Sequence, residues 1–150
     1  MRKEKAKLSQ EKTVNEIISF DENLQVLKKE FNEKINLSPY KIDTKFTNIQ
    51  ELKKIAATGL AASADFKSEL ENIGIIPESF NDYYNLLIKY LDNNTRISNL
   101  YLAYFDSKDY SVFDYSEIRQ LFKENDAIFK ALEQERIKIF KENKIDSLLE

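Results

Sequence analysis

The stretch IAATGLAASADF, residues 55–66, is apolar or small on every side of a helix for about three turns. A helix without a polar face has to be covered by other helices, so this stretch is expected at the centre of a helical bundle. Gly59 within it costs roughly 1 kcal/mol of helix propensity relative to Ala. This cost indicates either the close approach of a neighbouring helix or a bound ligand.

Three further segments carry apolar residues at the three- and four-residue spacing that one face of a helix requires. These are Val14, Ile17, Phe20, Leu24, Leu27, Phe31 and Ile35; then Phe80, Tyr83, Tyr84, Leu87, Leu91, Ile97, Tyr101 and Tyr104; and finally Ile118, Leu121, Phe122, Ile128, Phe129, Leu132, Ile139 and Phe140. The pattern predicts an all-α, antiparallel up-and-down four-helix bundle. We expect a single domain over residues 1–150, with about residues 1–8 as a flexible N-terminal tail.

Residues that break or cap helices separate these segments. Pro39 cannot continue the first helix, and Asp114 with Glu117 forms a capping arrangement at the start of the last. Gly74 is placed to close the helix that contains residues 55–66, with Ile75 making the hydrophobic contact that accompanies such a cap. The connection at residues 38–46 is long for a helical hairpin, but connections of this modest length still suit antiparallel neighbours.

One polar residue falls on an inward position. Asn94 lies at the inward spacing between Leu91 and Ile97 in the third helical pattern. A buried Asn must be hydrogen-bonded. We expect Asn94 to pair across the bundle, to fix the helix register, or to meet a polar ligand.

The composition argues against catalysis and against metal or cofactor binding. The chain has no His and no Cys, and its single Met is Met1, so the usual ligands of zinc, di-iron and haem sites are missing. The two glycines lie far apart, which excludes a glycine-rich phosphate loop. No nucleophile elbow or calcium-binding loop is present either. The sequence therefore predicts a protein that is not an enzyme and that holds no metal and no cofactor.

The charge pattern predicts neither a nucleic-acid partner nor insertion into a membrane. The net charge is −3 and the pI is about 5.3, which offers no electrostatic footprint for nucleic acid. No apolar run is long enough to span a bilayer. We expect a cytoplasmic location by default, or an exported or membrane-anchored one if a leader precedes this sequence in the native protein.

The segment YLAYFDSKDYSVFDYSE, residues 101–117, carries six aromatic rings and several acids. Tyr101 and Tyr104 continue the inward face of the third helix, whereas Tyr110 and Tyr115 have no place in the core pattern. Tyr rings among acids are typical of a protein-binding surface. The candidate partner-binding residues are Tyr110, Tyr115, Asp106, Asp109 and Asp114; the alternative is that the two rings cover the open end of the bundle.

The run LYLAYFDSKDYSVFDYSEIRQLF, residues 100–122, resembles a pattern in helical bacterial envelope lipoproteins. In that pattern an aromatic helix end, a Lys-Asp-Tyr turn and a capped final helix follow one another. The lipobox cysteine of those lipoproteins is absent from this chain. The resemblance implies an exported helical domain.

Two functions are consistent with these features. The first is a non-catalytic bundle of the immunity, inhibitor or adaptor type that binds another protein by surface recognition, with a basic partner favoured by the acidic surface. The alternative is an extracytoplasmic, lipoprotein-like or sensor-type domain that binds a small ligand between its helices near Gly59, Asn94 and Arg96. If the apolar surface of the second helix is shared with a second copy, the protein is a homodimer.

Overall fold

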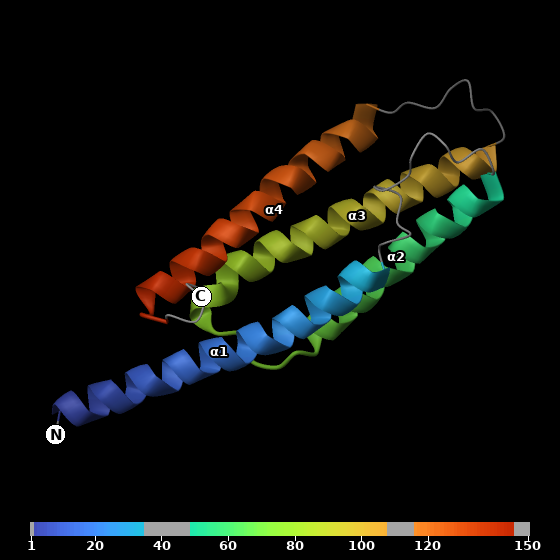
Figure 1. Ribbon diagram of the computed structural model, residues 1–150. Helices are drawn as coiled ribbons and strands as arrows, with labels where there is room; N and C mark the ends of the chain where they lie inside the picture. Colours follow the sequence, from blue (N-terminus) through green and yellow to red (C-terminus); the bar gives the residue numbers. More distant parts are fainter. Residues whose placement is uncertain (1, 35–48, 108–115, 146–150) are drawn as a thin grey trace.

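The computed structural model describes residues 2–34, 49–107 and 116–145, which form four long helices (Figure 1). The helices are α1 (Arg2–Lys34), α2 (Ile49–Glu71), α3 (Asn81–Ser107) and α4 (Ser116–Glu142), and a 3₁₀ turn, η3 (Glu78–Phe80), precedes α3. Successive helices run in opposite directions (Figure 1). The predicted all-α, up-and-down four-helix bundle is confirmed, and the described ranges contain no strand.

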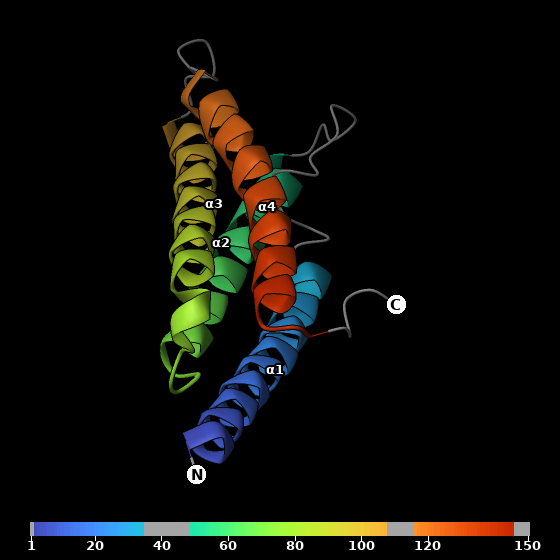
Figure 2. The ribbon, with the colours of Figure 1, turned by 90° about the vertical axis from the view of Figure 1, so that its left-hand side faces the viewer.

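The beginning of α1 falls within the range of the expected N-terminal tail. We expected a flexible tail over about residues 1–8, and α1 begins at Arg2. This segment consists mostly of Arg, Lys, Glu, Ala and Leu, which favour helix, and neither Gly nor Pro interrupts it. As a result, the first part of α1 extends beyond the other helices (Figures 1 and 2), and the side chains of residues 11–13 are exposed.

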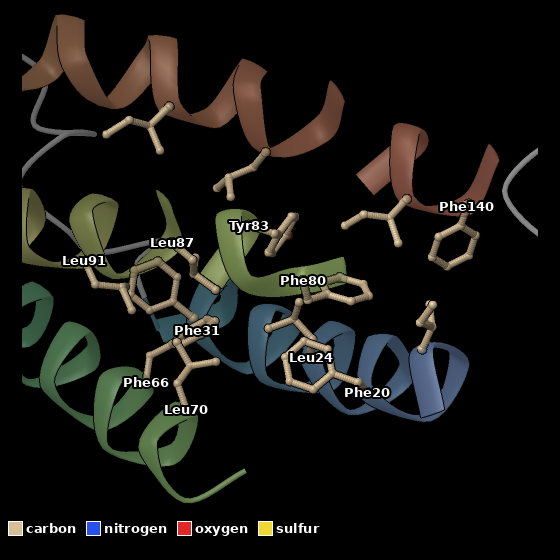
Figure 3. Packing of buried hydrophobic residues seen from close by; sticks show 14 of the residues in the cluster. Phe20, Leu24, Phe31, Phe66, Leu70, Phe80, Tyr83, Leu87, Leu91 and Phe140 are labelled. Atoms are coloured by element: carbon tan, nitrogen blue, oxygen red, sulfur yellow. The ribbon is translucent and has the colours of Figure 1, made fainter. Parts of the chain in front are cut away.

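The main apolar cluster joins all four helices (Figure 3). Phe20 of α1 packs on Phe80 with ring centroids 4.8 Å apart, and Phe31 of α1 meets Phe66 of α2 edge-on at 5.1 Å. The buried members are Ile17, Phe20, Leu24, Phe31, Ala62, Phe66, Leu70, Phe80, Tyr83, Leu87, Leu91, Ile128, Leu132, Ile139, Phe140 and Ile145. Most of the residues predicted to face inward therefore do so.

A second, smaller cluster lies at the other end of the bundle. Its buried members are Ala56, Ile97, Tyr101, Phe105 and Ile118, which come from α2, α3 and α4. α1 ends before it reaches this level: its last residue, Lys34, forms an ion pair at 3.7 Å with Asp65, which lies in the second half of α2 and away from Ala56. Among the described helices, one end of the bundle thus has four helices and the other has three.

The end of α2 confirms one expectation and contradicts another. Gly74 has a φ of +99°, the left-handed conformation expected of a residue that closes a helix. Ile75, however, is 93% exposed and makes no cap contact with the core. The amides of Asn72 and Ile73 already bond back to carbonyls of the last turn, so α2 ends before Gly74 and the chain has turned outward at Ile75.

We predict very different costs for truncating two apolar residues of the α2–α3 connection. Phe80→Ala should lower the free energy of unfolding by about 3–5 kcal/mol, because Phe80 is fully buried. Ile75→Ala should change it by less than about 0.5 kcal/mol, because Ile75 is exposed. Urea denaturation followed by circular dichroism measures both values, and equal costs would contradict this assignment of the core.

Candidate functional site

Most of the predicted partner-binding tip lies outside the described residues. Tyr110, Tyr115, Asp109 and Asp114 fall in the range 108–115, which the structure does not describe. Asp106 is described: it is exposed near the end of α3, and its carboxylate pairs with Nζ of Lys53 on α2 at 2.9 Å. The negative charge of Asp106 is therefore paired with a positive charge on α2.

The three residues of the alternative ligand site point in different directions. Gly59 is buried in α2, and Asn94 of α3 is only 1% exposed. Arg96 is exposed, and its Nε donates a hydrogen bond to Glu117 of α4 at 2.9 Å. Two residues along a helix correspond to a rotation of about 200°, so Asn94 and Arg96 cannot both face the interior. The structure brings Gly59 and Asn94 to the inside and leaves Arg96 on the surface.

Asn94 pairs with another buried Asn that the sequence analysis missed. Nδ2 of Asn125 on α4 donates to Oδ1 of Asn94 at 2.7 Å, and Nδ2 of Asn93 donates to Oδ1 of Asn125 at 3.0 Å. The signal was present, because Asn125 stands at helical spacing between Leu121 and Ile128. Asn125 stands between Glu124 and Asp126, and these charged neighbours made its inward position hard to recognise in the sequence.

Two buried serines join the Asn pair in what we call the polar layer: Ser63, Asn94, Ser98 and Asn125. The ion pairs Lys67–Asp92 and Lys53–Asp106, both 2.9 Å, set one antiparallel register that places Ser63 opposite the turn between Asn94 and Ser98. Within the described chain, Oγ of Ser63, Nδ2 of Asn94 and Oγ of Ser98 are buried without a hydrogen-bond partner. The polar layer lies between the two apolar clusters and contains only uncharged groups.

A groove follows the seam between α1 and α4. Its first part is lined by Ile18, Asp21, Glu22, Gln25, Val26, Arg136 and Phe140, and its second part by Gln25, Lys28, Lys29, Asn32, Glu33, Phe129 and Glu133. Gln25 belongs to both parts, so the groove is continuous. The backbone of α1 packs closely on α2, and that of α4 on α3. Side chains bridge the seam between α1 and α4, and this wider spacing creates the groove.

The strongest of these bridges is the ion pair between Asp21 and Arg136. Nε and Nη2 of Arg136 donate to the two carboxylate oxygens of Asp21, each at 2.8 Å. This hydrogen bonding raises the pKa of Arg136 above its ordinary value. The guanidinium also lies over the ring of Phe140, 5.2 Å from its centroid. Further along the groove, Nζ of Lys28 donates to the hydroxyl of Tyr83 at 2.9 Å.

Two large apolar side chains of the groove are more than half exposed. Val26 of α1 is 57% exposed and Phe129 of α4 is 56% exposed. The sequence pattern predicted that Phe129 would face the core, and this prediction is wrong. Ile128 occupies the inward position, and one residue along a helix rotates the side chain by about 100°, which turns Phe129 toward the seam.

Acidic residues predominate among the unpaired charges of the groove. Glu22, Lys29, Glu33 and Glu133 line it, and in the described part of the chain none of them forms an ion pair within 4.0 Å. The positive charge of Arg136 is matched by Asp21. Lys28 donates to the neutral hydroxyl of Tyr83 and keeps its charge, so the three glutamates share the groove with Lys28 and Lys29. The groove therefore combines exposed apolar side chains with an acidic rim.

Comparisons of the chain with known protein families, with curated proteins and with solved structures gave no match. In the residues that the structure describes, no group of three or more acidic, His or Cys side chains is arranged to hold a metal ion. None of the described helices is long and apolar enough to cross a membrane. Function is therefore inferred from the groove and the polar layer.

We predict that the two Asn residues of the polar layer are energetically coupled. Asn125→Leu should lower the free energy of unfolding by about 1–3 kcal/mol, because Asn94 then loses its partner. Asn94→Leu combined with Asn125→Leu should recover most of this loss, since no buried amide remains. Chemical denaturation of the single and double variants measures the coupling, and strictly additive effects would contradict it.

We also predict a loss of stability at alkaline pH that depends on Tyr90. Burial raises the pKa of the Tyr90 hydroxyl above its ordinary value of 10.0; the nearby Asn94 amide opposes this rise, and Asp126 adds to it. The unfolded chain therefore releases this proton first, so the stabilisation is complete below pH 10 and declines as the pH rises toward the folded-state pKa.

Tyr90→Phe should remove this contribution. The difference in free energy of unfolding between parent and variant should be constant below pH 10.0, the ordinary tyrosine pKa, and should shift in favour of the variant above it. Denaturation at a series of pH values provides the measurement. A difference that does not change with pH would rule out the role assigned to Tyr90.

Proposed function

We propose that this protein is a non-catalytic helical bundle of the immunity, inhibitor or adaptor type, which binds another protein in the groove between α1 and α4. The observation that carries the proposal is the exposure of Val26 and Phe129 in a groove rimmed by acids. Apolar side chains within a polar rim are the usual anatomy of a protein–protein interface. Phe and other aromatic residues are enriched at the centre of such sites.

The partner that suits this groove is an amphipathic helix carrying Lys or Arg. From Ile18 to Glu33 the groove follows α1 for about 22 Å, at about 1.5 Å per residue, which is the length of about four helical turns. A helix of this length can lay its apolar face into the groove. Basic residues at its edges would meet Glu22, Glu33 and Glu133, which favours fast association and the correct orientation.

The exposed apolar area is large enough to matter energetically. A Phe side chain can bury about 150–250 Å², and Phe129 is 56% exposed. Covering the remaining area of roughly 100 Å² at about 25 cal/mol per Å² contributes about 2–3 kcal/mol. This is the size of effect expected of an interface hot spot.

A second candidate function is binding of a small uncharged ligand between the helices. It is supported by the unpaired donors Ser63 Oγ, Asn94 Nδ2 and Ser98 Oγ in the polar layer. In this case an exported, sensor-type domain is the matching biological setting, whereas a cytoplasmic location suits the protein-binding function. The groove supports the first function more directly because it is open to a partner.

The groove can be tested by photo-crosslinking in the native host. Phe129→p-benzoylphenylalanine keeps an aromatic side chain at the exposed position, and the same substitution at Asn85, an exposed residue of α3, is the matched control. We expect a discrete adduct with another protein from position 129 only. The same adduct from both positions, or an adduct with a second copy of this chain, would contradict the proposal.

The identified partner then allows a direct measurement. We predict that Phe129→Ala weakens its affinity at least tenfold, which corresponds to about 1.4 kcal/mol or more. Glu133→Gln should lower the association rate and reduce its dependence on salt. Asn85→Ala should leave both unchanged. Calorimetry and stopped-flow kinetics provide these values, and an unchanged affinity for Phe129→Ala would exclude the groove as the binding site.

A further inference from the structure

An apolar cavity of about 40 Å³ lies between the four helices, next to the second part of the groove. Its inner walls are Phe31, Phe66, Leu87, Leu91 and Leu132, and four of them are labelled in Figure 3, where they gather between α1, α2 and α3. A site for one water molecule needs about 10–15 Å³ and two to four polar partners. The cavity is larger than this, and its five inner walls offer no such partner, although the half-buried Tyr90, which also lines the cavity, carries a hydroxyl.

The cavity opens into the groove. Lys28, Asn32, Phe129 and Glu133 line both the cavity and the second part of the groove, so they form the mouth between them. Phe129 is more than half exposed, whereas the five inner walls are buried. A side chain that approaches along the groove therefore passes Phe129 and reaches the core of the bundle.

The size and chemistry of the cavity define its occupant. Its five inner walls are hydrocarbon and Tyr90 adds a single hydroxyl, so a charged group would lose its hydration without gaining a counter-charge inside the cavity. Lys28 at the mouth is already engaged with Tyr83, both by a hydrogen bond and with its Nζ 5.7 Å from the ring centroid. The volume suits the terminal methyl groups of a branched aliphatic side chain and is too small for an aromatic ring.

We propose that this cavity is the anchor pocket of the groove and receives the methyl end of one Leu or Ile side chain from the basic amphipathic helix of the partner. The inference rests on the proposed function, because the groove brings the partner helix to the mouth of the cavity. A single apolar side chain inserted into a desolvated pocket is the usual form of an interface hot spot. The acidic rim and the apolar pocket together specify a helix with an aliphatic anchor flanked by Lys or Arg.

Xenon tests the cavity without any partner. In the full chain with ¹³C-labelled Leu methyl groups, xenon under pressure should cause saturable shifts at Leu87, Leu91 and Leu132. The methyls of Leu24, which is buried elsewhere in the main cluster, should not respond. Leu132→Phe should fill the cavity and abolish the response, and Leu87→Phe is a second filling variant in case the first does not fold. Weak shifts spread over the whole core would overturn the proposal.

Partner binding tests the role of the cavity as an anchor. Leu132→Phe leaves the groove surface unchanged, and we expect it to weaken binding of the crosslinked partner at least tenfold. Replacing the partner's aliphatic residue nearest Phe129 with Ala should weaken binding similarly, and the two changes should not be additive. Full affinity of a chain with a filled cavity would refute the anchor while leaving the groove as the binding site. Absence of any partner at Phe129 would refute both.

Discussion

The bidentate ion pair between Asp21 and Arg136 joins α1 to α4 across the seam that carries the groove. Its two hydrogen bonds, each 2.8 Å, cross a seam where the backbones of α1 and α4 are not in close contact. Asp21 is buried and Arg136 is partly covered by Phe140, so the pair is shielded from the solvent that weakens surface ion pairs. The long Arg side chain spans the seam, while the packing of α1 on α2 and in the main cluster holds α1 to the bundle.

The position of α1 along the bundle has a second consequence. α1 ends at Lys34, beside the second half of α2, and the polar layer lies just beyond this level. The described bundle thus changes from four helices to three near the place where its core changes from apolar to polar. Buried groups without partners cost stability, and a polar layer can specify one helix register among several. Asn94 and Asn125 meet in only one register of α3 and α4.

The groove and the cavity follow from the same wide seam. Where α1 and α4 are held apart, Phe129 remains at the surface. The side chains that line the cavity behind Phe129 do not fill it. Closer packing of the two helices would have buried Phe129 and Val26 and removed both features. Glu22, Glu33 and Glu133 also lie along this seam, and none of them forms an ion pair within 4.0 Å in the described part of the chain. One spacing between two helices thereby creates an apolar, acid-rimmed surface.

The sequence by itself determined the four helices, their order and most of the core. Apolar residues at helical spacing and the breakers at Pro39 and Gly74 are local features, and a local hydrogen-bonding pattern responds to them directly. The stretch from Ile55 to Phe66 was expected to be covered on every side, and this prediction is wrong, because Ala57, Ala61 and Ala64 are exposed and, among the described helices, α2 packs closely on α1 and α3 only. The inward position of Asn94 was also readable from its spacing. The predicted tip at Tyr110 and Tyr115 lies outside the described residues, so it stays a prediction.

The tertiary structure alone decided how the helices are spaced and staggered. Asp21 and Arg136 are 115 positions apart in the chain, and nothing in either local pattern links them. Ile128 and Asn125 are buried and Phe129 is exposed. Which of these side chains is buried depends on the helices that the corresponding face of α4 meets. Periodicity specifies the direction of a side chain relative to its own helix, but burial depends on the distance to the next helix, which long-range side-chain contacts set.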